Sequence, residues 1–547
     1  MIMASQGTLT SRWLNWTFLG GSLRARLKNR LPVGRGSCRA SNTANSMRPS
    51  WLGRSLALPC QAFFKHALRR TCVSFLLVAA ILGLEMSLAA APFDGTLKPG
   101  SKRIRAAEVS GDADDADADS PGFFNTQQEL EMEHMLPARW QKPLTNAGLD
   151  YVMIYTSEFM GNVHGGLVKG GIFAGVLEAG VAFDAEKLFG WRGATFYASS
   201  LMSHGPSLSD RLGDLYGGSS IESDSSVRLY QVWLEQSLFD DAVSVRVGQL
   251  AADREFLGTD VGTLFMNAAF GWPAAFSLSV DMPAYPVAAP GVRLRADASH
   301  FWAQAAVFTG KPEPIDDQGE VINGHGVYWN FNDSALLMWE AGYSTATEEE
   351  SSRYPGVYKV GGWLHTGWFE DQYYDQSGYG PLDVFNYTSD TWMARRLNWG
   401  FYGVAEQKIW RPANAVGEEG LSVFGRVATV PSDRNLVSLS VDGGLHYVGL
   451  LPGRPRDVAG VAFAYNSISP RALAWARDNN FWNNPPVPLP DYEAVLEFTY
   501  RIEIKPWWYL QPDVQFIMHP GARLDILPGG QATPNALVIG LRSTLSF

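Results

Sequence analysis

Apolar and polar residues alternate strictly from Tyr492 to Ile504. The even positions carry Tyr, Ala, Leu, Phe, Tyr, Ile and Ile, whereas the odd positions between them carry Glu493, Val495, Glu497, Thr499, Arg501 and Glu503. Side chains of a β-strand point alternately to the two faces of a sheet, so this period indicates a strand with one apolar and one polar face. Strands of soluble sheets usually have about five or six residues, and this one is about twice that length.

The same two-residue period recurs along the chain. Further alternating segments are 243–247, 437–447 and 461–465, and residues rich in Gly, Pro, Asp and Asn separate the segments. Helical periodicity is not evident over any length, so we expect a chain built of strands. The most apolar run after residue 84, Leu264–Val280, contains Asn267, Gly271 and Pro273. We interpret this run as strand ends and a loop.

The last segment indicates a membrane environment. Residues 537–547 alternate as before and end on Phe547, as does the closing strand of a bacterial outer-membrane barrel. A strand over 492–504 rises roughly 30 Å at about 3.3 Å per residue and a tilt near 40°, which is enough to cross the apolar band. A closed barrel satisfies every backbone hydrogen bond in lipid. The even side would then face lipid and the odd side a wet lumen, where truncating Glu497 or Arg501 should cost little stability.

Connection lengths agree with a barrel. The turn at Lys505-Pro506 is short, whereas the connections over 466–490 and 519–534 are long. Short periplasmic turns and long extracellular loops are the outer-membrane pattern. At roughly 25 residues per strand and connection, residues 140–547 supply about sixteen strands. The predicted fold class is therefore all-β, a transmembrane antiparallel β-barrel of sixteen strands.

The first part of the chain has a different character. Residues 1–91 are basic, with Glu85 as the one acid, and residues 65–90 have the charged start, apolar middle and small-residue end of a cleaved signal peptide. Residues 1–64 are interpreted as an over-extended start or a long pre-region. Residues 92–139, with the run GDADDADADSPG, form a predicted acidic flexible segment before the barrel at 140–547. All three cysteines (Cys38, Cys60 and Cys72) precede the predicted cleavage site, so we expect no disulfide in the mature protein.

Seven ordered segments resemble the carbohydrate-selective porins of the OprB family. They are AFDAEKLFGWRGATF (182–196), RLYQVWLEQ (228–236), VGQLAADREF (247–256), LFMNAAFG (264–271), YPVAAPGVRL (285–294), GRPRDVAG (453–460) and YRIEIKPWWYLQPDVQFIMHPG (500–521). The acidic run and the long presequence depart from the family pattern. The resemblance covers nearly all of 146–547. It implies a sixteen-stranded barrel that passes monosaccharides such as glucose by facilitated diffusion, with inward-folded loops that carry Arg and Glu into the pore.

The resemblance and the strand alternation together suggest pore-lining residues. A neutral sugar both donates and accepts hydrogen bonds, so a constriction needs donors and acceptors that face each other. The candidates are Arg228, Glu235, Arg246, Asp253, Glu255, Arg293, Glu497, Arg501, Asp513 and Gln515. Alternation places the last four in the lumen, whereas the others rest on their position in the matched segments. The alternative for each is a wall ion pair that never touches solute. Phe547 is the predicted assembly signal.

The expected partners are small neutral sugars, outer-membrane lipid, lipopolysaccharide and the barrel-assembly machinery, without nucleic acid or a cofactor. The sequence does not decide whether the protein is a monomer or a homo-oligomer. His164, His325, His365 and His446 lack metal-type spacing, so no metal is expected. The Trp pairs at 363/368 and 507/508 are interpreted as membrane-interface girdle residues.

Two other functions are considered. A general or anion-selective pore would share the fold and differ only in what passes through it. A secreted all-β carbohydrate hydrolase or lectin would explain the aromatic residues and acids, but not the terminal Phe547. Glu493 and Glu497 lie on one strand face, about 13 Å apart, which is wider than the carboxylate spacing of a glycosidase.

Overall fold

The computed structural model describes residues 135, 138–316, 321–331, 333–346, 354–381, 391–415, 417–482, 486–524, 526–527 and 530–547. The predicted presequence, the three cysteines and the acidic run at 111–119 lie outside the described residues. No helix among the described residues is long and apolar enough to cross a membrane.

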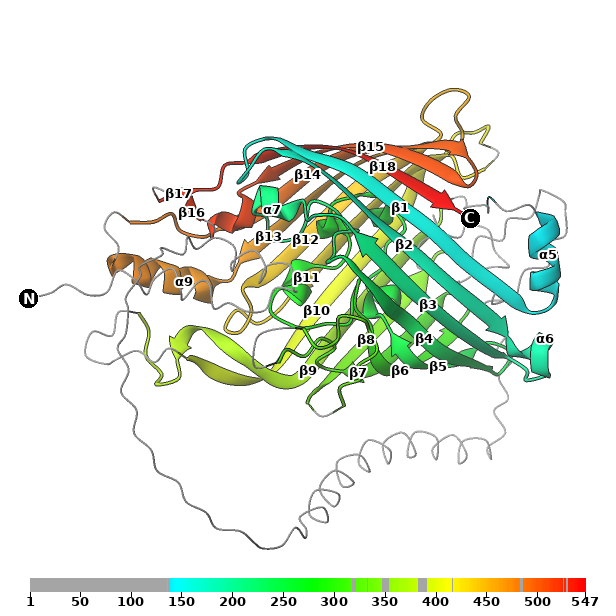
Figure 1. The fold of residues 1–547 in the computed structure, drawn as a ribbon, viewed down its shortest axis with the longest axis horizontal. Coiled ribbons are helices and arrows are strands. Elements are labelled where there is room, and N and C mark those ends of the chain that lie inside the picture. Colours follow the sequence, from blue (N-terminus) through cyan, green and yellow to red (C-terminus); the bar gives the residue numbers. More distant parts are fainter. Residues whose placement is uncertain are drawn as a thin grey trace, which may run out of the picture. The chain divides into compact units, whose positions relative to one another are not determined.

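Sixteen antiparallel strands form one closed barrel, in which each strand pairs with its sequence neighbours and β1 pairs with β18 (Figure 1). Their bounds are β1 Leu149–His164, β2 Gly170–Asp184, β3 Ala194–His204, β4 Ser226–Leu238, β5 Val243–Leu250, β6 Ala289–Ala298, β7 Phe301–Thr309, β8 Ala335–Ser344, β9 Gly356–Asp375, β10 Trp392–Trp410, β11 Gly420–Thr429, β12 Val437–Val448, β13 Val458–Ile468, β14 Tyr492–Lys505, β15 Trp508–Met518 and β18 Ala536–Ser546. The sixteen-stranded prediction is confirmed.

The two ends of the barrel differ in the length of their connections. At one end, the strands join through short turns such as those between β6 and β7, at residues 299–300, and between β14 and β15, at residues 506–507. At the other end, the connections are long, as between β5 and β6 (251–288), β7 and β8 (310–334) and β15 and β18 (519–535). The predicted turn after Lys505 and the two predicted long connections are confirmed.

Short helices precede β1 and occupy several connections between strands, and the sequence pattern missed them. They are α5 Ala138–Asn146, α6 Ala185–Phe189, α7 Ser209–Leu212, α8 Ala274–Ser277, α9 Pro470–Asn479 and the 3₁₀ turns η1 Ala252–Arg254, η2 Gly262–Leu264, η3 Ala268–Phe270, η4 Asn480–Trp482 and η5 Pro520–Arg523; β16 Ile526–Leu527 and β17 Gln531–Ala532 form a separate small sheet. Helix α9 begins where Ser469 accepts a hydrogen bond from Ala472 N and Pro470 occupies the first turn, which are standard start signals.

The two faces of the wall have the predicted chemistry. On β14, Phe498 is 52% exposed on the outer face, whereas its neighbours Glu497 and Thr499 are buried on the inner face. On β12, Val441 is exposed and Asp442 is buried. Apolar side chains point outward and polar ones inward, as the alternation predicts.

The connection from Ala251 to Ala288, here the lumen loop, folds into the barrel (Figure 1). It contains η1, η2, η3 and α8 and no strand. The interpretation of Leu264–Val280 as strand ends is therefore wrong. This run is apolar because Leu264, Phe265, Met266 and Phe276 are buried inside the barrel.

Candidate functional site

Polar groups on four strands hold the lumen loop against the wall. Glu340 on β8 accepts a hydrogen bond from Leu257 N at 3.0 Å, and Glu406 on β10 accepts one from Val261 N at 3.1 Å. Glu497 on β14 accepts from Met266 N at 2.6 Å and from Asn267 N at 2.9 Å, and Ser440 on β12 accepts from Ala275 N at 3.1 Å. The loop is therefore attached to the wall from β8 round to β14, beyond its own strands, β5 and β6.

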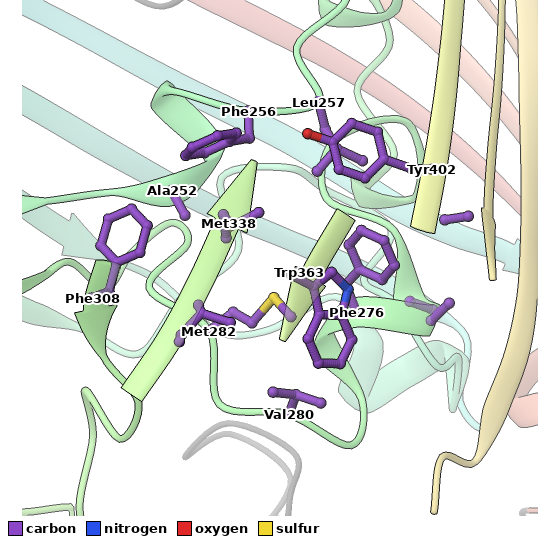
Figure 2. Close-up of a cluster of buried hydrophobic side chains, with 14 of the residues drawn as sticks. Ala252, Phe256, Leu257, Phe276, Val280, Met282, Phe308, Met338, Trp363 and Tyr402 are labelled. Atoms are coloured by element: carbon purple, nitrogen blue, oxygen red, sulfur yellow. The ribbon is translucent and has the colours of Figure 1, made fainter. Parts of the chain in front are cut away.

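Aromatic packing holds the same loop at its second half (Figure 2). The ring of Phe276 on α8 lies edge-on to Trp363 of β9, with centroids 5.6 Å apart, and to Tyr402 of β10, at 6.0 Å. Such edge-to-face pairs contribute about 0.5–1.5 kcal/mol beyond their burial. Trp363 is fully buried, so its assignment to a membrane girdle is wrong, whereas Trp368 on the same strand is exposed as predicted.

The inner face of β14 and β15 is packed against loops, which corrects the expectation of a wet lumen there. Glu493 and Glu497 are fully buried, and Glu493 accepts hydrogen bonds from Leu215 N at 2.8 Å and Gly521 N at 2.7 Å. Gln515 donates to the carbonyl oxygen of Gly218 and to Asp513, each at 2.9 Å. Arg501 is also buried, with its guanidinium 5.0 Å from the ring centre of Tyr509. The predicted low cost of truncating Glu497 or Arg501 therefore loses its basis.

Four of the predicted residues meet in one cluster, here the charge box: Glu235 on β4, Arg246 on β5, Arg293 on β6 and Glu255 in the lumen loop. Glu235 contacts Arg246 at 2.9 Å and Arg293 at 2.7 Å. Glu255 contacts Arg293 at 3.0 Å and also pairs with Arg246. The guanidinium of Arg246 lies over Trp233 at 4.0 Å, and its side chain keeps 12% exposure. Two arginines thus balance two carboxylates.

Arg228 and Asp253, also predicted, brace loops. Arg228 donates to the carbonyl oxygens of Pro286 at 3.2 Å and Asn323 at 2.9 Å and pairs with Glu313 at 2.7 Å. Asp253 accepts a hydrogen bond from Tyr285 N at 3.0 Å, which joins the start of the lumen loop to its end. Burial raises the pKa of the Asp253 carboxyl, and the adjacent Arg254 opposes that shift.

Among the ion pairs that the sequence reasoning missed, two involve the lumen loop, β2 and β6. Arg254 in the lumen loop pairs with Glu178 on β2 at 3.0 Å, and Arg295 pairs with Asp297, both on β6, at 2.8 Å. The side chain of Arg254 keeps 16% exposure inside the barrel. Arg254 lies within the matched segment 247–256, so its position offered a signal, whereas Glu178 lies outside every matched segment. Among the described residues, no group of three or more His, Cys, Asp or Glu residues is arranged to hold a metal ion.

A closed sixteen-stranded barrel with an apolar outer face, polar and charged side chains on its inner wall and an inward-folded loop defines a porin-type channel. The profile of the carbohydrate-selective porin, OprB family, matches residues 169–547, so the chain belongs to this family.

Individual relatives agree with this assignment. Porin B of Pseudomonas aeruginosa is 26% identical over 427 residues, which cover 74% of this chain and 88% of the relative. The putative porin QuiX of Acinetobacter baylyi is 21% identical over 432 residues, which cover 74% and 91%. A high-pH structure of Pseudomonas putida OprB matches with a TM-score of 0.66 at 24% identity, over 75% of this chain and 97% of the other. The protein is a sugar-diffusion porin, a channel of the outer membrane.

Proposed function

We propose that the channel selects small neutral sugars, monosaccharides such as glucose, at a constriction formed by the lumen loop and the facing wall of β2 and β4–β6. The observation that carries this proposal is charge balance. The partly exposed arginines of this region each have carboxylate partners: Arg246 in the charge box, Arg254 with Glu178, and Arg295 with Asp297.

Such pairs suit a sugar. A guanidinium presents N–H donors in a fixed fork, and a carboxylate presents only acceptors, so adjacent pairs match hydroxyl groups that do both. The ring of Trp233 beneath Arg246 adds an apolar surface to the same wall. These pairs thus offer polar contacts in which each positive charge has a negative partner.

Charge balance also separates this proposal from an anion-selective pore. An anion channel gains from arginines or lysines that stay uncompensated along the passage, because a net positive field concentrates anions. The described ion pairs of this region sum to zero charge, which favours neutral solutes over ions.

Flux through proteoliposomes tests the proposal. Swelling rates in glucose, a disaccharide, amino acids and salts, normalised to folded barrel, should be highest for glucose. Arg254→Ala and Glu178→Ala should each lower glucose flux severalfold and shift the reversal potential in opposite directions, toward cations and toward anions respectively. Equal flux of all solutes of one size, with no response to either variant, would instead indicate a general diffusion pore.

Assembly is a second part of the proposal. Phe547 continues the seam between β18 and β1, where its backbone N–H donates to Met153 O at 2.9 Å. We expect Phe547→Asp to impair insertion by the barrel-assembly machinery, because it places a charge at the rim of the apolar band. The amount of heat-modifiable barrel in outer membranes measures this, with Phe547→Tyr as the matched control. Normal amounts of Phe547→Asp barrel would contradict the assignment.

Processing and oligomeric state have direct tests. We propose that cleavage after Ala89, Ala90 or Ala91 removes the presequence, and amino-terminal sequencing of the membrane form would find residues from 1–64 if this is wrong.

Cross-linking in outer membranes distinguishes a monomer from a homo-oligomer embedded among lipid and lipopolysaccharide.

A further inference from the structure

The barrel wall is lower at β5 than at β4. β5 has eight residues and pairs with β4 only as far as Val232↔Gln249, although β4 begins at Ser226. Eight residues at about 3.3 Å each, tilted near 40°, rise about 20 Å. The apolar band of an outer-membrane barrel is about 25 Å tall, so β5 alone does not cover it.

A segment of the β7–β8 connection lies along the part of β4 that β5 leaves open. This rim segment comprises Asn323–Phe331. Leu229 N on β4 donates to the carbonyl oxygen of His325 at 3.0 Å, and His325 Nδ1 lies 2.9 Å from Val227 O. Gly326 has a φ of +69°, and a Cβ at this position would lie 2.0 Å from Leu229 O. Only glycine allows so close an approach here.

Hydrogen bonds within the rim segment, and from the segment to side chains of β4 and β5, also hold it in place. Asn323 Oδ1 accepts a hydrogen bond from Tyr328 N at 2.9 Å, and Asn323 O accepts one from Arg228 at 2.9 Å. Trp329 Nε1 donates to Gln249 Oε1 at 2.6 Å, at the end of β5. Three backbone polar groups of the segment, Asn323 O, His325 O and Tyr328 N, thus have partners in the protein, and satisfied backbone groups are what a position beside lipid requires.

The outer surface of the rim segment is apolar and aromatic. Val327 and Phe331 are 70% and 68% exposed, and Tyr328 and Trp329 are exposed as well. The segment contains no Asp, Glu, Lys or Arg. On the neighbouring strands, Val227 of β4 and Val247 of β5 are exposed on the outer face, so the apolar surface of the wall continues into the segment.

We propose that the rim segment completes the lipid-facing wall above β5 and contacts the bilayer at the boundary between acyl chains and headgroups. Tyr and Trp are enriched at that level because one part of the side chain is apolar and the other is polar. Arg228, which lies on the inner side of β4, acts as a positioning residue for this surface through its bond to Asn323.

Site-directed spin labelling tests this inference in the full chain, with Cys38, Cys60 and Cys72 replaced by Ser. Single cysteines are introduced as Phe331→Cys in the rim segment, Val247→Cys on the outer face of β5 and Ser377→Cys in the exposed β9–β10 connection. Each nitroxide-labelled barrel is placed in phospholipid vesicles after heat-modifiable migration has confirmed folding. Accessibility to oxygen, which concentrates in lipid, is compared with accessibility to a water-soluble nickel chelate.

The expected result is an oxygen-to-nickel ratio at Phe331→Cys severalfold above that at Ser377→Cys and close to that at Val247→Cys. A ratio equal to that of Ser377→Cys would place the segment in water and overturn the proposal. Low accessibility to both reagents with dipolar broadening would indicate a second copy of the chain instead of lipid, and would also overturn it. Val327→Cys serves as a second label site if Phe331→Cys does not fold.

A displacement variant adds a specific readout. Gly326→Ala, combined with Phe331→Cys, should raise nickel accessibility because the added Cβ cannot fit against Leu229 O. Gly324→Ala is the matched control, since a Cβ at Gly324 meets nothing within 4 Å. Equal accessibility in the two double variants would mean that contact with β4 does not position the segment.

Discussion

Two inner walls of this barrel carry buried carboxylates that serve different purposes. On β14, Glu497 accepts hydrogen bonds from two backbone N–H groups of the lumen loop. On β4, Glu235 pairs instead with Arg246 and Arg293. Both glutamates are buried, and both were predicted to line the pore. The first wall attaches the loop, whereas the second presents charge pairs to the remaining passage.

The comparison shows that an inward-facing acid in a porin is not by itself a solute contact. A carboxylate whose two oxygens each accept from a buried backbone N–H group is engaged in holding the fold. A carboxylate between arginines leaves N–H donors of those arginines available, and Arg246 keeps partial exposure. Substitutions on the first wall should therefore affect stability, and those on the second should affect selectivity.

The largest expected effect follows Glu497→Ala. It leaves Met266 N and Asn267 N buried without their acceptor, and each such group costs about 1–3 kcal/mol, so the free energy of unfolding should fall by about 2–6 kcal/mol. Urea titration, with the folded fraction read from the heat-modifiable migration of the barrel, measures this loss in the free energy of unfolding. Single-channel conductance of the folded fraction should rise, because the loop loses an attachment.

Glu503→Ala is the matched control for that variant. Glu503 lies near the end of the same strand, with contacts to Tyr509 Oη at 3.4 Å and to the exposed Arg456 at 3.5 Å. Pairs of this kind contribute about 0–1 kcal/mol. If both variants lost the same small amount, the anchoring role of Glu497 would be wrong.

The second-largest effect concerns the outer, lipid-facing side of β14. Phe498→Arg places a charge on the apolar outer face and should cost about 2–4 kcal/mol near the bilayer midplane. Sugar flux per folded barrel should stay unchanged, since residue 498 points away from the lumen. The yield of folded barrel after refolding into vesicles, with Phe498→Leu as control, measures this. An unchanged yield would contradict the inside–outside assignment of β14.

Strand phase and facing could be predicted from sequence because alternation with a period of two has a direct structural consequence. Phe498 outward and Glu497 inward follow from that pattern alone. The lumen loop could not be found this way. Its residues Leu264, Phe265 and Met266 are as apolar as a strand, yet they are buried against the inner wall rather than exposed to lipid.

Contacts between distant residues explain the remaining errors about the site. The N–H groups that Glu497 binds belong to backbone, which carries no side-chain signal, and they lie more than two hundred positions away. The partners of the predicted arginines could not be identified from the sequence either. Arg246 pairs with Glu235 and Glu255, because adjacent strands bring Arg246 opposite Glu235 and the lumen loop brings Glu255 to it.

A smaller effect on stability and a clear effect on selectivity should follow Glu255→Gln in the charge box. Glutamine keeps the size and one acceptor oxygen, so the loss should stay near 1–3 kcal/mol. The cluster changes from neutral to one net positive charge, which should shift the reversal potential in a salt gradient toward anions. Glucose flux per folded barrel should fall. A reversal potential equal to that of the unsubstituted channel would place the charge box away from the passage.

The smallest effect should follow Arg501→Ala, on the inner face of β14. The Arg501 guanidinium lies 5.0 Å from the ring centre of Tyr509, and a cation–π contact of this kind contributes about 0.5–2 kcal/mol. We expect a loss of about that size and a change in glucose flux smaller than that of Glu255→Gln. Arg501→Lys is the control, because it keeps the charge over the ring. Urea titration and glucose uptake are measured for the unsubstituted, Arg501→Ala and Arg501→Lys proteins. The results show whether the inner wall at β14 or the one at β4 selects the solute. A flux loss at Arg501→Ala larger than that at Glu255→Gln would move the selective region to β14 and reverse the comparison.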